Sequence, residues 1–243
     1  MMSTVVLSDV DHPSIQEKAI SLTAASESTM DKLKSIFHFV RDEIKFGFPP
    51  KWDVVKASEV LAYGIGQCNN KATLFVALCR AAGIGAKIHC GNIDADIMRG
   101  VFPFFAFPFL PKAGGHSWTE VQIEGQWKPI DSYINDKAFY EGARRKLSES
   151  RRPFGYSVSF FEGKSSCEFN FGEKGFVHMG AVVEDHGTWE DFSQYVASNK
   201  YSSLDSLQLM LYPMMAKLCN RNIERMRSSR PAARAVDPVL EQV

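Results

Sequence analysis

Three residues of the sequence have the side-chain types that a thiol-based catalytic triad requires: Cys68, His116 and Asp131. Cys68 follows a turn that contains Gly64 and Gly66 and opens an apolar segment, so we expect it to begin a helix. A helix N-terminus carries about half a positive charge, which can lower a thiol pKa from about 8.5 toward neutrality. Such a thiol can attack a carbonyl while the imidazole exchanges the proton and the carboxylate orients the imidazole.

The segments that carry His116 and Asp131 are predicted to form a β-hairpin. The dipeptide Glu124-Gly125 between them is typical of a two-residue turn, which would pair Ile123 with Gln126. In that register the imidazole and the carboxylate share one face of the sheet and lie diagonal to each other, within side-chain reach. A three-residue turn would instead move Asp131 to the opposite face.

Hydrophobic periodicity predicts the elements that must hold these residues. Helices come first and strands follow, an order typical of an α+β fold with an antiparallel sheet. The helix that begins at Cys68 is apolar on most of its surface, so we expect it to be central and buried. The expected helices are 14–26, 29–44, 58–62, 68–82, 188–197 and 203–226, and the expected strands are 86–91, 116–123, 127–131 and 156–161.

The sequence resembles the transglutaminase-like superfamily of cysteine acyl-transfer enzymes and hydrolases in three motifs: Gly66-Gln67-Cys68, the segment 116–121 and the segment 127–131. The resemblance covers residues 30–137. It implies a papain- or transglutaminase-like core with N-terminal helices, a central helix that bears the nucleophile and an antiparallel sheet, plus a C-terminal extension. It also implies Cys68 as nucleophile, His116 as general base and acid, and Asp131 as the residue that orients the imidazole.

The chain is expected to divide into a catalytic core and an extension. We place the transglutaminase-like core at residues 1–150. We expect residues 151–243, with a mixed strand and then helical pattern, to pack on this core as the extension.

An enzyme of this kind needs hydrogen-bond donors for the oxyanion of its tetrahedral intermediate. The backbone N–H of Cys68 is the simplest donor. A second donor is left open between the side-chain amide of Gln67 and the indole N–H of Trp52. Phe46 lies where small family members often carry a tyrosine, and its ring has no donor to offer.

The segment 101–111 is rich in phenylalanine and contains three prolines, which exclude a regular helix or a central strand. Two interpretations are open. The favoured one is a loop that plugs the core beneath the extension, because many exposed phenylalanines would promote aggregation. The other is a lid or apolar wall beside the thiol, with Phe105, Phe107 and Trp118 as candidates for a substrate pocket.

The remaining histidines and the composition narrow the range of functions. His178 and His186 are eight residues apart, which fits no standard metal motif, so we expect solvated loop residues rather than a weak metal site or a pocket lining. The 28 basic and 28 acidic residues cancel, which favours neither nucleic acid nor an anionic membrane as a partner. The five scattered cysteines include no Cys-x-x-Cys pair, and we expect a reducing, cytoplasmic location.

Our first hypothesis is a cysteine-dependent amide hydrolase or acyltransferase that works through a thioester on Cys68. Peptidase or amidase activity on a peptide or small amide is preferred to cross-linking, because no amine site can be seen, and neither route needs a metal or an organic cofactor. The alternative is a catalytically silent binding module that uses the phenylalanine-rich segment and the C-terminal half. An arylamine acetyltransferase ranks third, because no Arg-Gly-Gly sequence leads into Cys68.

Overall fold

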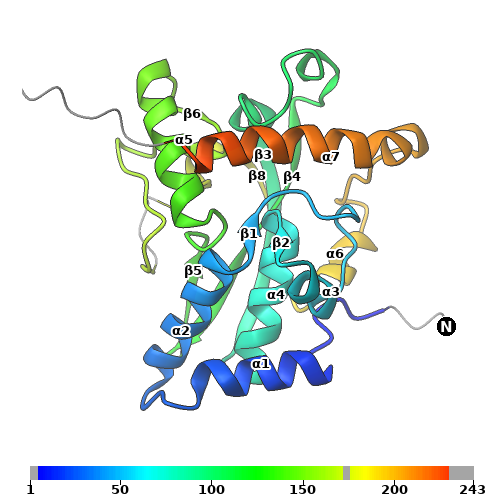
Figure 1. Ribbon diagram of the computed structural model, residues 1–243. Helices are drawn as coiled ribbons and strands as arrows, with labels where there is room; N and C mark the ends of the chain where they lie inside the picture. The colour runs from blue at the N-terminus through cyan, green and yellow to red at the C-terminus, as the bar shows by residue number, and fades with distance from the viewer. Residues whose placement is uncertain (1–4, 172–175, 230–243) are drawn as a thin grey trace, which may run out of the picture.

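The computed structural model describes residues 5–171 and 176–229 and has an α+β fold, with helices packed against a four-stranded sheet (Figure 1). The helices are α1 (Pro13–Thr23), α2 (Thr29–Asp42), α3 (Ala57–Tyr63), α4 (Cys68–Ala81), α5 (Lys137–Ser150), α6 (Phe192–Val196) and α7 (Ser206–Arg227). The strands are β1 (Lys45–Phe46), β2 (Ile65–Gly66), β3 (Ala86–Asp94), β4 (Ala113–Ile123), β5 (Gln126–Ile130), β6 (Phe154–Gly155), β7 (Val158–Ser159) and β8 (Val182–Trp189).

The central sheet has the strand order β5-β4-β3-β8, and each neighbouring pair is antiparallel. Its outer strand β8 comes from the C-terminal part of the chain, where the sequence analysis expected no strand and a helix from residue 188. That expectation was wrong for residues 182–189, because the free edge of β3 supplies hydrogen-bond partners that local composition does not reveal. The domain boundary at residue 150 stays a prediction.

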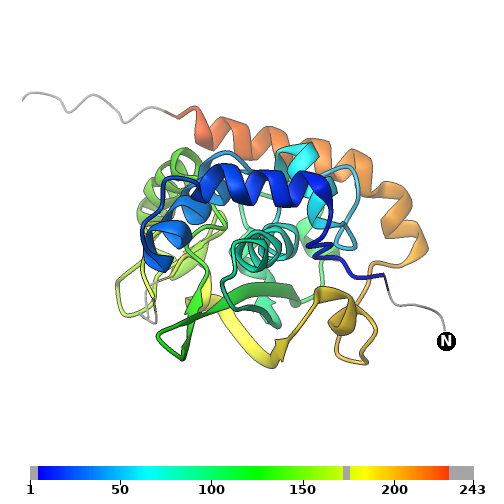
Figure 2. The ribbon, with the colours of Figure 1, turned by 90° about the horizontal axis from the view of Figure 1, so that it is seen from below.

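Helix α4 lies between the sheet and the N-terminal helices, as the view in Figure 2 shows with α4 seen end-on. Its residues from Asn69 to Cys79 are all buried, as expected for a helix that is apolar on most sides. Phe75 of this helix stacks on Tyr133 with ring centroids 4.3 Å apart, and the Tyr133 hydroxyl lies 2.6 Å from that of Thr119. These contacts fix the helix against β4.

The hairpin of β4 and β5 has the predicted register. Ile123 pairs with Gln126, and the turn residues Glu124 and Gly125 have φ angles of 50° and 78°. Both angles lie in the left-handed region that a tight two-residue hairpin turn requires. The prediction of a two-residue turn is therefore confirmed, and Asp131 follows directly after the end of β5.

The single strand expected at 156–161 is not present. The chain instead makes a tight hairpin of β6 and β7, with Tyr156 and Ser157 at φ angles of 54° and 59°. The amides of these two residues donate to the carbonyl oxygens of Arg99 and Ile97, 2.7 and 2.8 Å away. Contacts distant in sequence thus bend the segment that alternation alone would leave extended.

The phenylalanine-rich segment projects above α7 at the top of Figure 1 and does not plug the core. Phe104 and Phe109 are 89% and 84% exposed, and Phe105 is 53% exposed. Val101 and Ala106 are buried, and Phe102 packs inward with its ring centroid 5.6 Å from that of Phe48. The favoured interpretation was wrong because the prolines and a short 3-10 turn, Phe107–Phe109, hold these rings away from the core.

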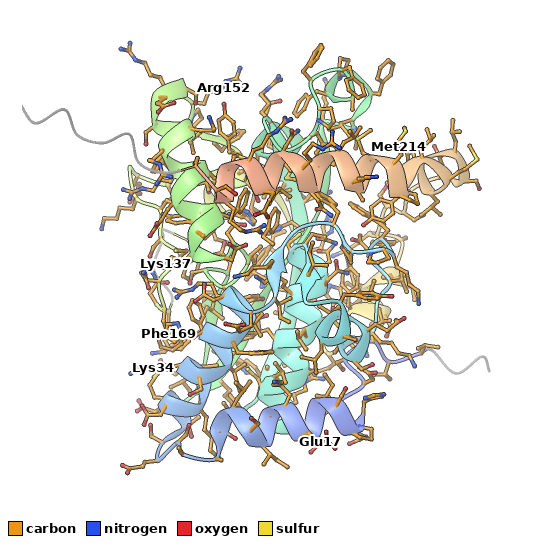
Figure 3. All side chains as sticks on the ribbon, in the orientation of Figure 1. Glu17, Lys34, Lys137, Arg152, Phe169 and Met214 are labelled. Atoms are coloured by element: carbon orange, nitrogen blue, oxygen red, sulfur yellow. The ribbon has the colours of Figure 1, made fainter. Side chains whose placement is uncertain are left out.

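Helix α7 runs across the upper part of the molecule in Figure 1, and its side chains tie the C-terminal part to the segment after β1 (Figures 1 and 3). Asn220 bonds both backbone groups of Phe48, and the hydroxyl of Tyr212 donates to the carbonyl oxygen of Pro49 at 2.7 Å. The outer side of α7 is apolar and exposed, with Leu207, Met210, Leu211 and Met214 at helical spacing. Within the described residues, no helix is long and apolar enough to span a bilayer.

Replacing Phe75 by Ala should lower the free energy of unfolding by about 3–5 kcal/mol, because it empties the contact between α4 and Tyr133. Phe104→Ala is the matched control, since this ring is exposed, and should change the stability by less than about 0.5 kcal/mol. Urea denaturation measures both. Equal losses in the two variants would contradict the packing described here.

Candidate functional site

Cys68 is the first residue of α4, as the sequence predicts, and its position is set by the preceding turn. Gln67 is the N-cap, and its side-chain oxygen accepts the amide hydrogen of Asn69 at 2.9 Å. Gly66 ends β2, where an added Cβ would lie 3.0 Å from the Cβ of Asn70, so only glycine fits without displacement. The parallel pair of β1 and β2 thus leads directly into the nucleophile position.

The thiol of Cys68 is hydrogen-bonded to acceptors rather than to a cation. It donates to Oε1 of Gln67 at 2.9 Å, with Oδ1 of Asn69 at 3.6 Å. Burial, followed by the negative charge of Asp53, raises the pKa of Cys68 to about 12, although the amides of Ser117, Asn69 and Cys68 lower it in part. In the free protein the N-terminus of α4 therefore does not offset the effects of burial and of the adjacent carboxylate on the thiol.

Asp53 is linked to the thiol of Cys68 through hydrogen bonds to the side chain of Gln67. Its buried carboxylate accepts from Nε2 of Gln67 and, at 3.2 Å, from the hydroxyl of Tyr201. Burial raises the pKa of Asp53 to about 6, against these hydrogen bonds, so the group is largely ionised at neutral pH. The pattern of residues around Cys68 gave no signal for Asp53, which lies 15 residues earlier in the chain.

The sulfur of Cys68 lies against the backbone of β4 at Ser117, the residue that follows His116. The amide of Ser117 faces the sulfur and favours its thiolate form. Pairing between β4 and β5 ends at Thr119 and Ile130, which leaves the backbone of Ser117 uncovered by β5. The candidate nucleophile therefore contacts the residue next to the candidate base.

His116 and Ser117 point to opposite faces of the sheet, because side chains alternate along a strand. The face of Ser117 and Thr119 is covered by α4 through Tyr133. His116 shares the other face with Trp118, and their ring centroids are 5.8 Å apart. The imidazole of His116 therefore lies on the face of β4 opposite to the side chain of Ser117.

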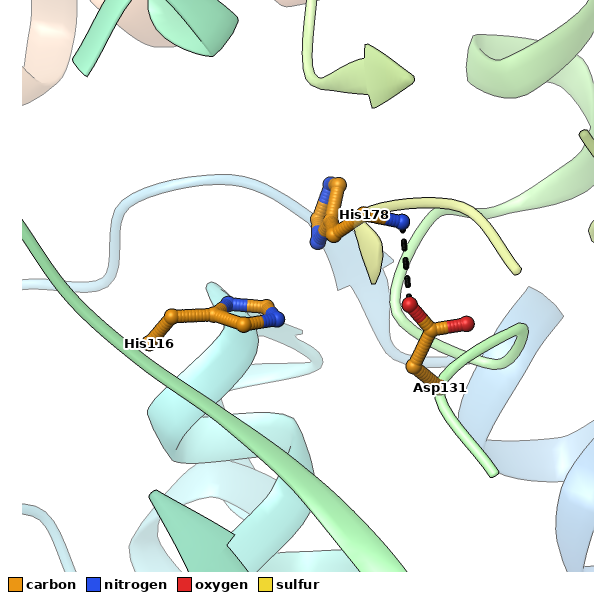
Figure 4. Close-up of side chains that lie close together, drawn as sticks. All are labelled: His116, Asp131 and His178. Carbon is orange, nitrogen blue, oxygen red and sulfur yellow. Dashed lines mark hydrogen bonds between the residues drawn. The ribbon is translucent and has the colours of Figure 1, made fainter. Parts of the chain in front are cut away.

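The structure brings His116 and Asp131 together and adds a third residue, His178 (Figure 4). One nitrogen of each ring and one carboxylate oxygen all lie within 4.8 Å of one another. The carboxylate accepts the amide hydrogens of Val177 at 3.0 Å and His178 at 2.9 Å. Burial raises the pKa of Asp131 to about 7, although these amides oppose the shift.

Both imidazoles of this cluster are neutral at physiological pH. Burial, followed by the neighbouring His178, holds the pKa of His116 well below its usual range. Burial lowers the pKa of His178 to about 4. Among the described residues, Nε2 of His116 and Nδ1 of His178 have no hydrogen-bond partner.

The expectation that His178 and His186 are solvated loop residues was wrong, since both side chains are buried. His178 is held by Ser157 of the β6–β7 hairpin, whereas His186 lies 2.8 Å from the hydroxyl of Tyr195. The two histidines therefore belong to separate surroundings. Their spacing could not reveal this, because the contacts come from segments distant in sequence.

The three candidate donors to the oxyanion differ in which groups they already contact. The backbone N–H of Cys68 faces its own sulfur and belongs to the first helical turn, where amides have no intrahelical acceptor. The side-chain oxygen of Gln67 accepts from the thiol, and its side-chain nitrogen donates to Asp53. This amide N–H₂ group therefore does not point at the position of an oxyanion on the sulfur side. Trp52 is partly buried, stacked on Phe48 and in edge contact with Tyr212.

The pocket candidates are not gathered at the thiol. Trp118 is buried and stacked on His89, with centroids 4.1 Å apart. Phe107 lies beneath the guanidinium of Arg99 at 4.2 Å and lines a shallow groove of about 400 Å³. None of the residues that line this groove is a candidate catalytic residue.

Comparison with known proteins identifies the segment that holds the site. Residues 16–132 match the family model of the transglutaminase-like superfamily. The matched segment, a little under half of the chain, is thus similar to a transglutaminase-like core. Cys68, His116 and Asp131 all lie within it. The prediction of an α+β fold with N-terminal helices, a central helix that begins at Cys68 and an antiparallel sheet is confirmed by the structure.

Two solved structures are similar to the chain over about half of its length. A "putative cysteine protease" from Cytophaga hutchinsonii is 21% identical with a TM-score of 0.40, and the match covers 52% of this chain and 38% of that one. A "putative protease" from Parabacteroides distasonis is 15% identical with a TM-score of 0.36, over 51% of this chain and 25% of that one. The chain thus spans less than half the length of either. No curated protein matches it.

Replacing Asp53 by Asn should lower the pKa of Cys68, because it removes a negative charge that disfavours the thiolate. Alkylation of Cys68 by iodoacetamide, followed by peptide mass spectrometry between pH 7 and 10, should be severalfold faster in the variant. Asp205→Asn, at the exposed start of α7, is the control and should leave the rate unchanged. An unaltered or slower rate in Asp53→Asn would contradict the electrostatic account.

Proposed function

We propose that the protein is a cysteine-dependent amide hydrolase or acyltransferase that forms a thioester on Cys68. The family match over residues 16–132 supports the general class. The observation that carries the proposal is the placement of Cys68 at the start of α4, against the residue that follows His116, with Asp131 within reach of that imidazole. Peptides or small amides are the proposed substrates, in keeping with the chemistry of a thiol nucleophile.

The first step of the proposed reaction is activation of the thiol. The hydrogen now directed to Gln67 must pass to the imidazole of His116, because only the thiolate attacks a carbonyl. Asp131 would accept from the other ring nitrogen of His116 and stabilise the imidazolium that forms. The raised pKa of Cys68 means that this transfer is proposed to occur when substrate is bound, not in the free protein.

The second step is attack of the sulfur on the amide carbonyl. The S–C bond forms, the carbonyl oxygen becomes an oxyanion, and the backbone N–H of Cys68 is the proposed donor to it. The imidazolium of His116 then gives its proton to the amine, the C–N bond breaks, and a thioester remains. The residues of the chain supply every proton transfer in this sequence.

The third step is removal of the acyl group. We propose water as the acceptor, activated by His116, so that the products are a carboxylic acid and the free thiol. An amine acceptor would give transamidation by the same route. We further propose a reducing compartment such as the cytoplasm, since all five cysteines are unpaired.

A catalytically silent binding module is the second candidate function. Two observations favour it: the raised pKa of Cys68 and the exposed apolar side chains of Phe104, Phe109 and Met214. A binding module would use these surfaces and would not depend on the thiol.

Cys68→Ala should reduce hydrolysis of a panel of fluorogenic peptide amides by at least about a thousandfold, because it removes the nucleophile. Cys167→Ala removes a different buried thiol and is the matched control, expected to keep most of the activity. Circular dichroism checks that both variants fold. Turnover in Cys68→Ala equal to that of the unmodified protein would contradict the mechanism, and no turnover by any form would favour the binding module.

A further inference from the structure

The partners of His178 determine which of its ring nitrogens carries the hydrogen. Its Nε2 lies 2.8 Å from the carbonyl oxygen of Ser157 and 2.8 Å from the hydroxyl of the same residue. A carbonyl oxygen can only accept, so Nε2 must be the donor, and a neutral imidazole has only one N–H. The other nitrogen, Nδ1, therefore has an available lone pair, and among the described residues nothing donates to it.

This lone pair faces a second buried nitrogen of the same kind. The rings of His116 and His178 are in edge contact, with centroids 5.1 Å apart and planes at 74° (Figure 4). Nε2 of His116 is also buried and has no partner in the described structure. The carboxylate of Asp131 completes a set of two nitrogens and one oxygen within 4.8 Å of one another.

We propose that His116, Asp131 and His178 form a binding site for a zinc-type divalent cation, and that the bound cation holds the candidate catalytic histidine inactive. Imidazole nitrogen and carboxylate oxygen are ligands that Zn²⁺ takes at about 2.0–2.2 Å. Tetrahedral bonds of that length separate two ligand atoms by about 3.3 Å, so the three groups need to approach by no more than about 1.5 Å.

The surroundings of the three ligands fit this assignment. A metal-bound histidine usually donates its second ring N–H to a carbonyl or carboxylate, and His178 does this toward Ser157. The carboxylate of Asp131 is held in place by the amides of Val177 and His178, which leave lone pairs on its oxygens for a cation. The two orphaned nitrogens would gain the partner that buried polar atoms normally have.

The bound cation would inhibit the proposed hydrolase because it fixes the tautomer of His116; this part of the inference rests on the proposed function. A neutral His116 bound through Nε2 carries its hydrogen on Nδ1. It then has no free lone pair with which to accept the proton of Cys68. The carboxylate of Asp131 is withdrawn from the imidazole at the same time, so the cation would occupy both the base and the residue that orients it.

The test measures zinc binding directly, in the full chain carrying Cys68→Ala so that the thiol cannot bind the metal. Titration of Zn²⁺ against a chromophoric chelator should give one ion per chain with a micromolar or lower dissociation constant. His178→Gln in the same background should weaken binding at least about tenfold. His38→Gln, which removes an exposed histidine on α2, is the matched control and should not change it.

Binding that is absent, or equally weakened by His178→Gln and His38→Gln, would overturn the proposal. Thermal melting checks that His178→Gln folds. If it does not fold, Co²⁺ added to the Cys68→Ala protein provides the second measurement, with intense tetrahedral absorption supporting the site and none refuting it. Zinc binding in a protein without hydrolase activity would refute the proposed function alone, whereas hydrolysis without zinc binding would refute this inference alone.

Discussion

The contact between the first turn of α4 and the backbone of β4 is the constraint on which the candidate site depends. Gln67 caps the helix and holds the thiol of Cys68, while the amide of Ser117 faces the same sulfur. The stack of Phe75 on Tyr133 keeps helix and strand at this spacing. A shift of α4 along β4 would therefore separate the sulfur from the strand that carries His116.

Burial determines the electrostatic state of the site in the free protein. The thiol, the two imidazoles and the carboxylates of Asp53 and Asp131 all have pKa values shifted toward their neutral forms. A low dielectric penalises each isolated charge, but it also strengthens an ion pair once the pair has formed. In the free protein the thiol and the two imidazoles are therefore uncharged, and we expect proton transfer between them to begin only when a bound substrate supplies a carbonyl.

Local signals in the sequence were sufficient for the parts of the fold that local interactions decide. The glycines before Cys68 and the apolar run after it predicted the start of α4, and Glu124-Gly125 predicted the hairpin register. Both features depend on residues within a few positions of each other. The family motifs then related Cys68, His116 and Asp131 across a longer span.

The remaining features depend on contacts that a linear pattern does not contain. His178 was assigned to solvent because its spacing from His186 fits no standard metal motif, and only the fold of β6 and β7 places Ser157 against it. The same holds for β8, which pairs with a distant strand, and for the charge of Asp53 near the thiol. The exposed ring of Phe104 shows the converse error, since apolar type alone does not establish burial.

A crystal structure of the full chain treated with a peptide aldehyde would test the central claim most directly. The account predicts a covalent bond from the sulfur of Cys68 to the aldehyde carbon, with a ring nitrogen of His116 within about 3.5 Å of the hemithioacetal. It also predicts that the oxygen of the adduct accepts from the backbone N–H of Cys68. An adduct with the imidazole still on the far face of β4, or no adduct at Cys68, would contradict the account.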